Sequence, residues 1–341
     1  MSPGFHGYIL TSGRRSRESR RVVVSAAEMT QDLATARRLW RERFAATTLH
    51  RWEALTRRVG VESHLKLELT LPTGSFKVRG ALYALSREHE RAPVREVVAA
   101  STGNHGAAVA WAACELGVAA RVFVPVGANA TKMARIESFG AHLTQAGADI
   151  EGARRAAEAH ASAMNAFLLD DATNTDVPVG PGTIGIEVLE QCPTCATVVV
   201  PVGDSALIRG VAVAMKASRP DVRIVGVQAR GAPAYYESWR AGRVITTDTA
   251  DTIADGLATT TPTAHNVAVV RDLVDEMVLV SEDEMLDAMR WLVAEEGLTA
   301  EPAAAASVAA MLQPGRRWTG PAVALLTGGN VSPELLGRLR Q

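Results

Sequence analysis

The stretch Thr73-Gly74-Ser75-Phe76-Lys77-Val78-Arg79-Gly80-Ala81 passes from a turn of small residues into a helical pattern. Its lysine differs from an ordinary surface lysine because Phe76 precedes it and glycines flank it, which lets backbone and ligand approach closely. A lysine that is partly desolvated in such a pocket, beside Arg79, is expected to have a lowered pKa and to form a Schiff base. Lone lysines in glycine-rich turns are mostly structural, so the rest of the chain must decide between the two interpretations.

Three further segments join a strand-like run to a helical pattern. Ser101-Thr102-Gly103-Asn104-His105-Gly106 follows the apolar run at 97–100 and opens an alanine-rich helix. A second strand-to-helix turn spans 198–208, and Leu325-Leu326-Thr327-Gly328-Gly329-Asn330 is a third. With these four segments in this order, the chain resembles the serine/threonine dehydratase and serine racemase family, which are fold-type II pyridoxal-phosphate enzymes. The resemblance runs from about residue 48 to residue 331.

The resemblance implies a cofactor, pyridoxal 5'-phosphate (PLP), held covalently by Lys77. In that family the freed lysine amine removes the Cα proton of the substrate, and the cofactor spreads the resulting negative charge. We therefore expect β-elimination from a small hydroxy amino acid such as threonine or serine, giving a 2-oxo acid and ammonia. β-Replacement and amino-acid racemisation are the alternatives within the class. A cofactor-altered relative acting as a binding protein is the alternative outside it.

The start of the helix that follows residue 103 is a candidate binding site, because the first backbone N–H groups of a helix are unpaired and can bind an anion. The resemblance places the substrate carboxylate there. The substrate-binding residues so implied are Ser101, Thr102, Gly103, Asn104 and His105. The same resemblance places Asn104 against the phenolic oxygen of the cofactor and Phe76 in the cofactor site. His105 is interpreted as a structural helix-start residue rather than a base.

Two threonines bear on the kind of reaction. Thr102 lies where related racemases carry a second acid/base hydroxyl on the opposite face of the cofactor, which makes it a candidate catalytic residue. Its crowded hydroxyl suits carboxylate binding better. Thr327 matches the family's hydroxyl residue beside the pyridine nitrogen. A neutral hydroxyl does not keep that nitrogen protonated as a carboxylate would, so the cofactor is a weaker electron sink and elimination is favoured over transamination.

The clearest departure from the family lies where relatives have a run of glycines whose backbone N–H groups cradle the phosphate. The cofactor-binding residues predicted in this loop are Gly203, Asp204, Ser205, Ala206 and Leu207. A carboxylate about 4 Å from a phosphate charge costs roughly 4 kcal/mol at an effective dielectric constant near 20. We therefore expect Asp204 to point out of the nest, toward Arg209, while backbone N–H groups and Ser205 hold the phosphate.

No divalent metal site is expected. Relatives resembling serine racemase bind a cation through a glutamate and a later aspartate, and these positions are Gln228 and Ala234 here. Hard cations prefer carboxylate ligands. Cys192-Pro193-Thr194-Cys195 has the spacing of a redox motif, but it precedes a strand rather than opening a helix. Neighbouring zinc ligands are also missing from the sequence, so loop cysteines are the favoured interpretation.

The composition is that of an ordinary globular protein: the chain has 341 residues, of which 47% are hydrophobic and 21% charged, with a formal net charge of −1. A charge near zero gives no bulk attraction to nucleic acid or to membrane surfaces. Three cysteines do not make a disulfide framework, and no apolar run approaches the roughly 20 residues of a membrane span. We expect a cytoplasmic homodimer with a small amino-acid substrate and neither nucleic-acid nor membrane partners.

Val-rich strands alternate with alanine-rich helices from Leu65 onward. This pattern predicts an α/β fold with mainly parallel sheets flanked by helices. The chain length suggests two lobes, and the resemblance implies the tryptophan synthase β-like arrangement of fold-type II. The resemblance places a small inserted domain at 96–173, between the parts 29–95 and 174–341 of a large cofactor-binding domain. Residues 1–28, rich in Arg and Ser, are expected to be a disordered tail.

Overall fold

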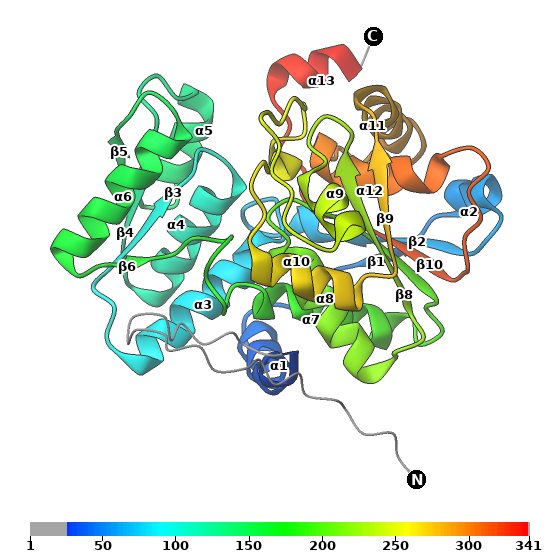
Figure 1. Cartoon of the computed structure of the whole chain (residues 1–341), viewed down its shortest axis with the longest axis horizontal. Helices are drawn as coiled ribbons and strands as arrows, with labels where there is room; N and C mark the ends of the chain where they lie inside the picture. Colours follow the sequence, from blue (N-terminus) through cyan, green and yellow to red (C-terminus); the bar gives the residue numbers. More distant parts are fainter. Residues whose placement is uncertain (1–25, 340–341) are drawn as a thin grey trace.

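The computed structural model describes residues 26–339, which form two lobes with one sheet each (Figure 1). The predicted α/β class with mainly parallel sheets is confirmed. The tail predicted at 1–28 lies outside the described residues, except that 26–28 already belong to the first helix. No helix in the described range is both long and apolar enough to cross a membrane.

The large lobe is built on a six-stranded sheet in the order β1-β2-β10-β7-β8-β9. Its strands are β1 (Leu49–Arg51), β2 (Ser63–Leu67), β7 (Thr197–Pro201), β8 (Arg223–Ala229), β9 (Glu276–Val280) and β10 (Ala322–Leu326). β1 pairs antiparallel with β2, and the other neighbouring pairs are parallel. β2, β7 and β10 are buried along their whole length, as expected of a sheet with helices on both faces. The sequence prediction missed β1, a three-residue edge strand too short to show a period.

Helices of the large lobe cover both faces of this sheet. They are α1 (Ala26–Arg41), α2 (Glu53–Val59), α3 (Lys77–Arg91), α7 (Val179–Gln191), α8 (Ala206–Ser218), α9 (Ala234–Ala241), α10 (Ala264–Leu273), α11 (Glu282–Glu296), α12 (Pro302–Leu312) and α13 (Pro333–Leu339), with 3₁₀ turns η2 (Glu68–Thr70) and η3 (Asp255–Leu257). α12 contacts β7 to β10, and its buried alanines 303–306 allow the close approach. On the other face, α7 and α8 pack against each other and against β7 and β8.

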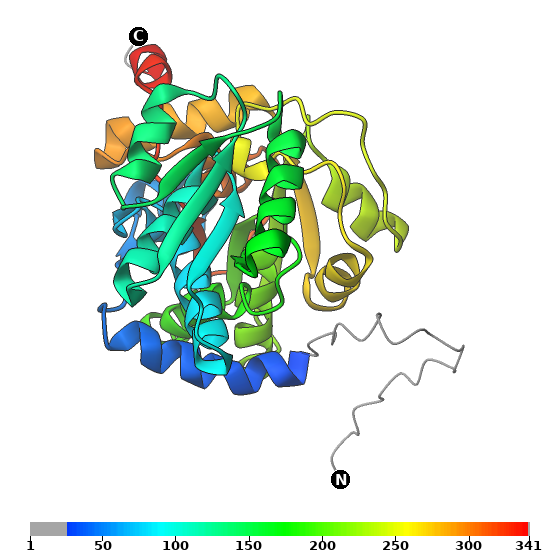
Figure 2. The ribbon, with the colours of Figure 1, turned by 90° about the vertical axis from the view of Figure 1, so that its left-hand side faces the viewer.

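The small lobe carries a four-stranded, all-parallel sheet in the order β5-β4-β3-β6. Its elements are β3 (Glu96–Ala100), α4 (Asn104–Leu116), β4 (Ala119–Val124), α5 (Ala130–Glu137), β5 (His142–Gln145), α6 (Ile150–Met164) and β6 (Phe167–Leu168). Successive side chains of β3 point to opposite faces: Val97 packs with α4, whereas Val98 packs with α6. Figure 2 looks onto this lobe, whose strands run side by side, and shows α1 along one end of the molecule.

The carboxyl ends of the parallel strands bring the sequence motifs together. β3 leads to Ser101, β7 leads to Gly203 and β10 leads to Thr327. The lysine-bearing turn joins them through an isolated bridge between Ser75 and Gly328. Since open α/β sheets bind ligands outside the carboxyl ends of their strands, this edge is where a site is expected.

Candidate active site

A large cleft between the two lobes contains most of the predicted site. The predicted residues that line it are Lys77, Ser101, Thr102, Gly103, Asn104, His105 and Asp204. A second group, Ser205, Ala206, Leu207 and Thr327, is buried. Gly203 packs so tightly that a Cβ there would lie 2.1 Å from the Gly256 carbonyl oxygen, which explains why the loop keeps this glycine. Phe76 packs against the core cluster around β7 and β10, and its backbone N–H donates to the Thr327 carbonyl.

The amine of Lys77 faces a set of carboxylates and forms an ion pair with Asp171. Burial alone would lower the pKa of Lys77, but Asp171, Asp204 and Glu301 outweigh burial and raise the pKa above its ordinary value. The lowered pKa predicted from the sequence is therefore wrong for this state of the protein. The error arose because the turn shows only that the lysine is partly desolvated, while the acids that face it come from distant segments.

Asp171 is a site residue that the sequence interpretation did not single out. Burial by itself would raise its pKa, but the neighbouring charges of His105 and Lys77 hold the pKa well below its usual range. The His105 ring is fixed through a 2.9 Å hydrogen bond between Nε2 and the Leu169 carbonyl oxygen, and its Nδ1 lies 3.7 Å from Asp171. His105 is thus anchored at the helix start, as expected. The signal for Asp171 was its place just beyond strand β6, on the same edge as the other motifs.

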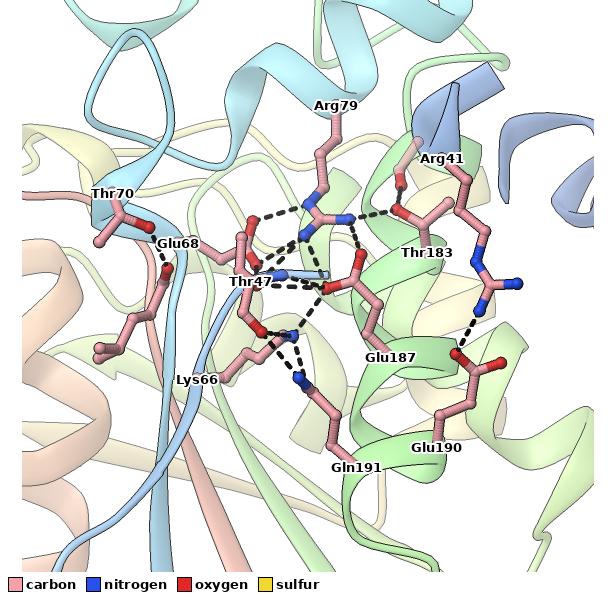
Figure 3. Close-up of polar contacts among 12 residues, drawn as sticks. Arg41, Thr47, Lys66, Glu68, Thr70, Arg79, Thr183, Glu187, Glu190 and Gln191 are labelled. Atoms are coloured by element: carbon pink, nitrogen blue, oxygen red, sulfur yellow. Dashed lines mark hydrogen bonds and ion pairs between the residues drawn. The ribbon is translucent and has the colours of Figure 1, made fainter. Parts of the chain in front are cut away.

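Arg79 does not lie beside the lysine amine but belongs to a buried charge cluster of Arg79, Lys66, Glu68 and Glu187 (Figure 3). Its guanidinium donates to Glu68 at 2.7 and 2.9 Å and to Glu187 at 2.7 and 3.0 Å. Lys66 donates to Glu187 at 2.7 Å. Because residues two apart on a helix point in nearly opposite directions, Lys77 faces the cleft while Arg79 faces the protein interior. The cluster anchors the first turn of α3 behind the lysine.

Asn104 links the two lobes across the cleft. Its amide nitrogen donates to both carboxylate oxygens of Glu301 at 2.9 and 3.0 Å, and its Oδ1 accepts from Asn330 at 2.6 Å. Gly74 approaches Asn330 with φ of 59°, and a Cβ there would lie 2.7 Å from Asn330 Oδ1. Asn104 is therefore held in one orientation at the start of α4. Its contact with the phenolic oxygen of the cofactor stays a prediction.

Among the described residues Asp204 makes no ion pair with Arg209, so the expected direction toward Arg209 is wrong, whereas its position outside the phosphate nest stays a prediction. Its Oδ1 accepts a 2.9 Å hydrogen bond from the hydroxyl of Thr259 on the cleft wall. Burial and the neighbouring carboxylate of Asp171 raise the pKa of Asp204. Arg209 instead donates from Nε to Ser205 Oγ at 3.2 Å. The hydroxyl of Thr259 and the nearby lysine charge stabilise the carboxyl group where it stands.

Two further charged residues on the cleft wall were missed as site residues. Glu301 occupies the N-cap position of α12 without a side-chain cap hydrogen bond, and its carboxylate accepts from Asn104 in the cleft. Arg135 projects from α5 and donates to the Thr73 carbonyl oxygen, and burial lowers its pKa. No sequence signal separated Arg135 from other helical arginines.

The positions that would carry metal ligands in relatives are occupied differently here. Gln228 is buried and its Oε1 accepts from the Tyr236 backbone at 2.8 Å, so it serves the start of α9. Ala234 is buried in the first turn of that helix. Within the described part of the chain, no group of three or more His, Cys, Asp or Glu side chains is placed to hold a metal ion.

Comparison with known proteins identifies the family. Residues 41–328 match the family model described as "Pyridoxal-phosphate dependent enzyme", and the chain belongs to this family. It is 36% identical to L-threonine ammonia-lyase of Thermotoga maritima, over 91% of this chain and 77% of that protein. The protein of the same name from Geobacter sulfurreducens is 35% identical over 87% of this chain and 74% of its own length. The structure of maize serine racemase is similar with a TM-score of 0.86 and 30% identity, covering 91% of this chain and 95% of that chain.

The family's cofactor is PLP, and the residues of the cleft fit it. An amine able to bond the cofactor covalently, that of Lys77, stands in a cleft that is also lined by Asn104 at the start of α4 and by Asp204 shortly before α8. Helix starts attract anions such as a substrate carboxylate or a phosphate. Two buried hydroxyls of the lysine turn, Thr73 Oγ1 and Ser75 Oγ, have no hydrogen-bond partner among the described residues 26–339 and can serve a bound group.

Proposed function

We propose that the protein is a PLP-dependent ammonia-lyase acting on a small hydroxy amino acid, threonine or serine, to give a 2-oxo acid and ammonia. The observation that carries the proposal is the Lys77 amine, which stands in a cleft lined also by the Ser101–His105 loop at the start of α4. The similarity to two proteins named L-threonine ammonia-lyase supports the choice of substrate.

The substrate carboxylate is proposed to bind at the Ser101–His105 loop. The unpaired N–H groups and the positive end of the α4 dipole stabilise an anion at this position. Asn104 is held there by Glu301 from the opposite lobe, so carboxylate binding and lobe position are linked. Thr102 lines the same cleft and is available to the carboxylate through its hydroxyl.

Lys77 is proposed to move the proton. When bound, PLP withdraws electron density from the substrate Cα and so acidifies its proton. The Lys77 amine takes that proton, and the carboxylates of Asp171 and Asp204 stabilise the resulting ammonium, as the raised pKa of Lys77 indicates. The same ammonium can give a proton to the hydroxyl leaving Cβ, so that water departs. Thr327, buried at the end of β10, is proposed to lie beside the pyridine nitrogen.

Incubation with L-threonine or L-serine tests this function. The full-length protein loaded with PLP should release equal amounts of 2-oxo acid and ammonia, and Lys77→Ala should abolish the release. Lys216→Ala is the matched control, because Lys216 lies on α8 and pairs with Asp275 away from the cleft. Borohydride reduction followed by peptide mapping should label Lys77. A label on Lys66 or Lys132 instead would contradict the assignment.

Racemisation is the second candidate, and similarity to maize serine racemase together with the Thr102 hydroxyl in the cleft supports it. Chiral chromatography of the serine left after incubation distinguishes the two, because a racemase accumulates D-serine without 2-oxo acid. A cytoplasmic homodimer remains part of this proposal. Sedimentation equilibrium of the PLP-loaded protein tests the dimer, and a monomer at micromolar concentration would contradict it.

A further inference from the structure

The two buried arginines of the described chain differ in their partners. Arg79 is 1% exposed and is bonded to two carboxylates. Arg209 is 3% exposed, and the hydrogen bond it makes within residues 26–339 runs from Nε to the uncharged Ser205 hydroxyl at 3.2 Å. In the same range no carboxylate lies within ion-pair distance of its guanidinium; Asp204 influences it only as a nearby charge. Arg209 is thus a buried cation whose charge is not balanced by a direct contact.

Such a cation is costly where it stands. Removing a charge from water without a counter-ion costs several kcal/mol in a real protein. Arg209 also lies one turn into α8, which begins directly after Ser205, and the positive end of the helix dipole disfavours a cation there. Both penalties disappear if an anion occupies the start of this helix.

The surroundings show where the guanidinium lies. Ser205, with φ of 69°, bonds the Tyr235 hydroxyl at 3.1 Å, and Asn266 donates to the same hydroxyl at 3.3 Å. Asn266 and His265 line the cleft. Burial first, and then the positive charge of Arg209, lower the pKa of His265. Arg209 therefore lies close behind the cleft wall, at the loop that departs from the family's run of glycines.

We propose that Arg209 supplies the positive charge that holds the phosphate group of PLP at the start of α8. A phosphate monoester carries roughly 1.5 to 2 negative charges at neutral pH, which balances both the guanidinium and the helix dipole. With Asp204 and Ser205 in place of glycines, the backbone N–H groups of the loop bind the phosphate less strongly. The guanidinium compensates for this loss. This inference rests on the proposed function only in taking PLP as the cofactor.

Comparing PLP with pyridoxal, which has the same ring and aldehyde but no phosphate, isolates this interaction. The full-length apoprotein is titrated with each compound, and the dissociation constant is read from the visible absorbance of the lysine-bound ring. Arg209→Met should weaken PLP binding by about 10- to 100-fold, the range for a hydrogen bond to a charged group, and change pyridoxal binding by less than about 3-fold. Lys216→Met removes a positive charge from the same helix, outside the cleft, and should change neither.

Arg209→Gln is the second variant, in case the methionine variant does not fold. The glutamine side chain keeps two N–H donors but carries no charge. This variant should therefore also lose affinity for PLP but not for pyridoxal. Equal losses for PLP and pyridoxal would mean that Arg209 only supports the fold, and unchanged PLP affinity would mean that the phosphate is held without it. Either result overturns the inference while leaving the lyase proposal intact. If the wild-type protein binds neither compound, the proposed function itself fails.

Discussion

Replacing Arg79 by methionine removes the centre of the buried charge cluster that lies behind Lys77. The substitution keeps much of the side-chain volume but leaves Glu68 and Glu187 facing each other with one remaining cation, Lys66. Removing one partner of a buried ion pair costs roughly 3–5 kcal/mol, and here one guanidinium serves two carboxylates. Since proteins are stable by only about 5–15 kcal/mol, we expect Arg79→Met to lose a large part of its stability.

Urea unfolding of the full-length protein, followed by circular dichroism, measures the effect. Arg290→Met is the matched control, because Arg290 forms an exposed pair with Asp287 three residues earlier in α11, and such pairs contribute about 0–1 kcal/mol. A double variant with Glu187→Gln should lose less than the sum of the single losses, since the two residues are in contact. If Arg79→Met and Arg290→Met shift the urea midpoint equally, the structural role assigned to the cluster is wrong.

The same cluster gives a signed pH dependence. Burial alone would raise the pKa of Glu187, but the hydrogen bonds and charges of Arg79 and Lys66 outweigh it and lower the pKa. A carboxyl group with a lowered folded-state pKa stabilises the protein above its unfolded pKa, roughly 4.3, and this stabilisation is lost as the pH falls through the folded-state value. In Arg79→Met, protonation of Glu187 at low pH should therefore cost less stability than in the wild-type protein, or should even increase stability.

Three further outcomes are expected. Asp171→Asn should lower the pKa of Lys77, because burial is then less opposed, so the pH midpoint for covalent capture of PLP by the apoprotein should move down; an unchanged midpoint would contradict the ion pair. Lys132→Met breaks an exposed ion pair with Asp255 that joins the two lobes. It should change KM for threonine by less than about 3-fold, since such pairs contribute about 0–1 kcal/mol. A larger change would show that the pair controls lobe closure. Chelator treatment should leave turnover unchanged, since Gln228 stands where a ligand carboxylate is expected; recovery of lost turnover by magnesium would refute this.

Much of the fold could be predicted because parallel strands buried on both faces read as short Val-rich runs. The apolar runs at 197–202 and 322–326 form β7 (Thr197–Pro201) and β10 (Ala322–Leu326). The direction of side chains was harder to predict. Arg79 seemed to neighbour the lysine in sequence, yet helix geometry sends it to Glu68 and Glu187, which lie in segments far apart in the chain. The lobe boundaries at 96 and 173 stay a prediction.

Asp171 shows the limit of local patterns. Its effect on the Lys77 pKa depends on the distance between a loop after β6 and the start of α3, in different lobes. A sequence motif shows which residue types are present, but it does not show which charged side chains lie close together across a cleft. For that reason the motif predicted a lysine that does line the cleft, Lys77, but gave the wrong sign for its pKa shift.

The loop at 203–207 shows the opposite case, because local helix geometry alone was enough to predict the partner of Arg209. Residues four apart on a helix are neighbours, whereas residues five apart are not. Arg209 therefore meets Ser205, at the cap of α8, rather than Asp204 one residue earlier. Applied to the sequence, this rule would have predicted that Arg209 does not pair with Asp204. It would also have indicated a cation near a helix start with no counter-ion beside it. The altered loop is thus followed by a helix that carries a buried cation, Arg209. The phosphate role proposed for this cation would let the protein bind PLP in spite of the altered loop.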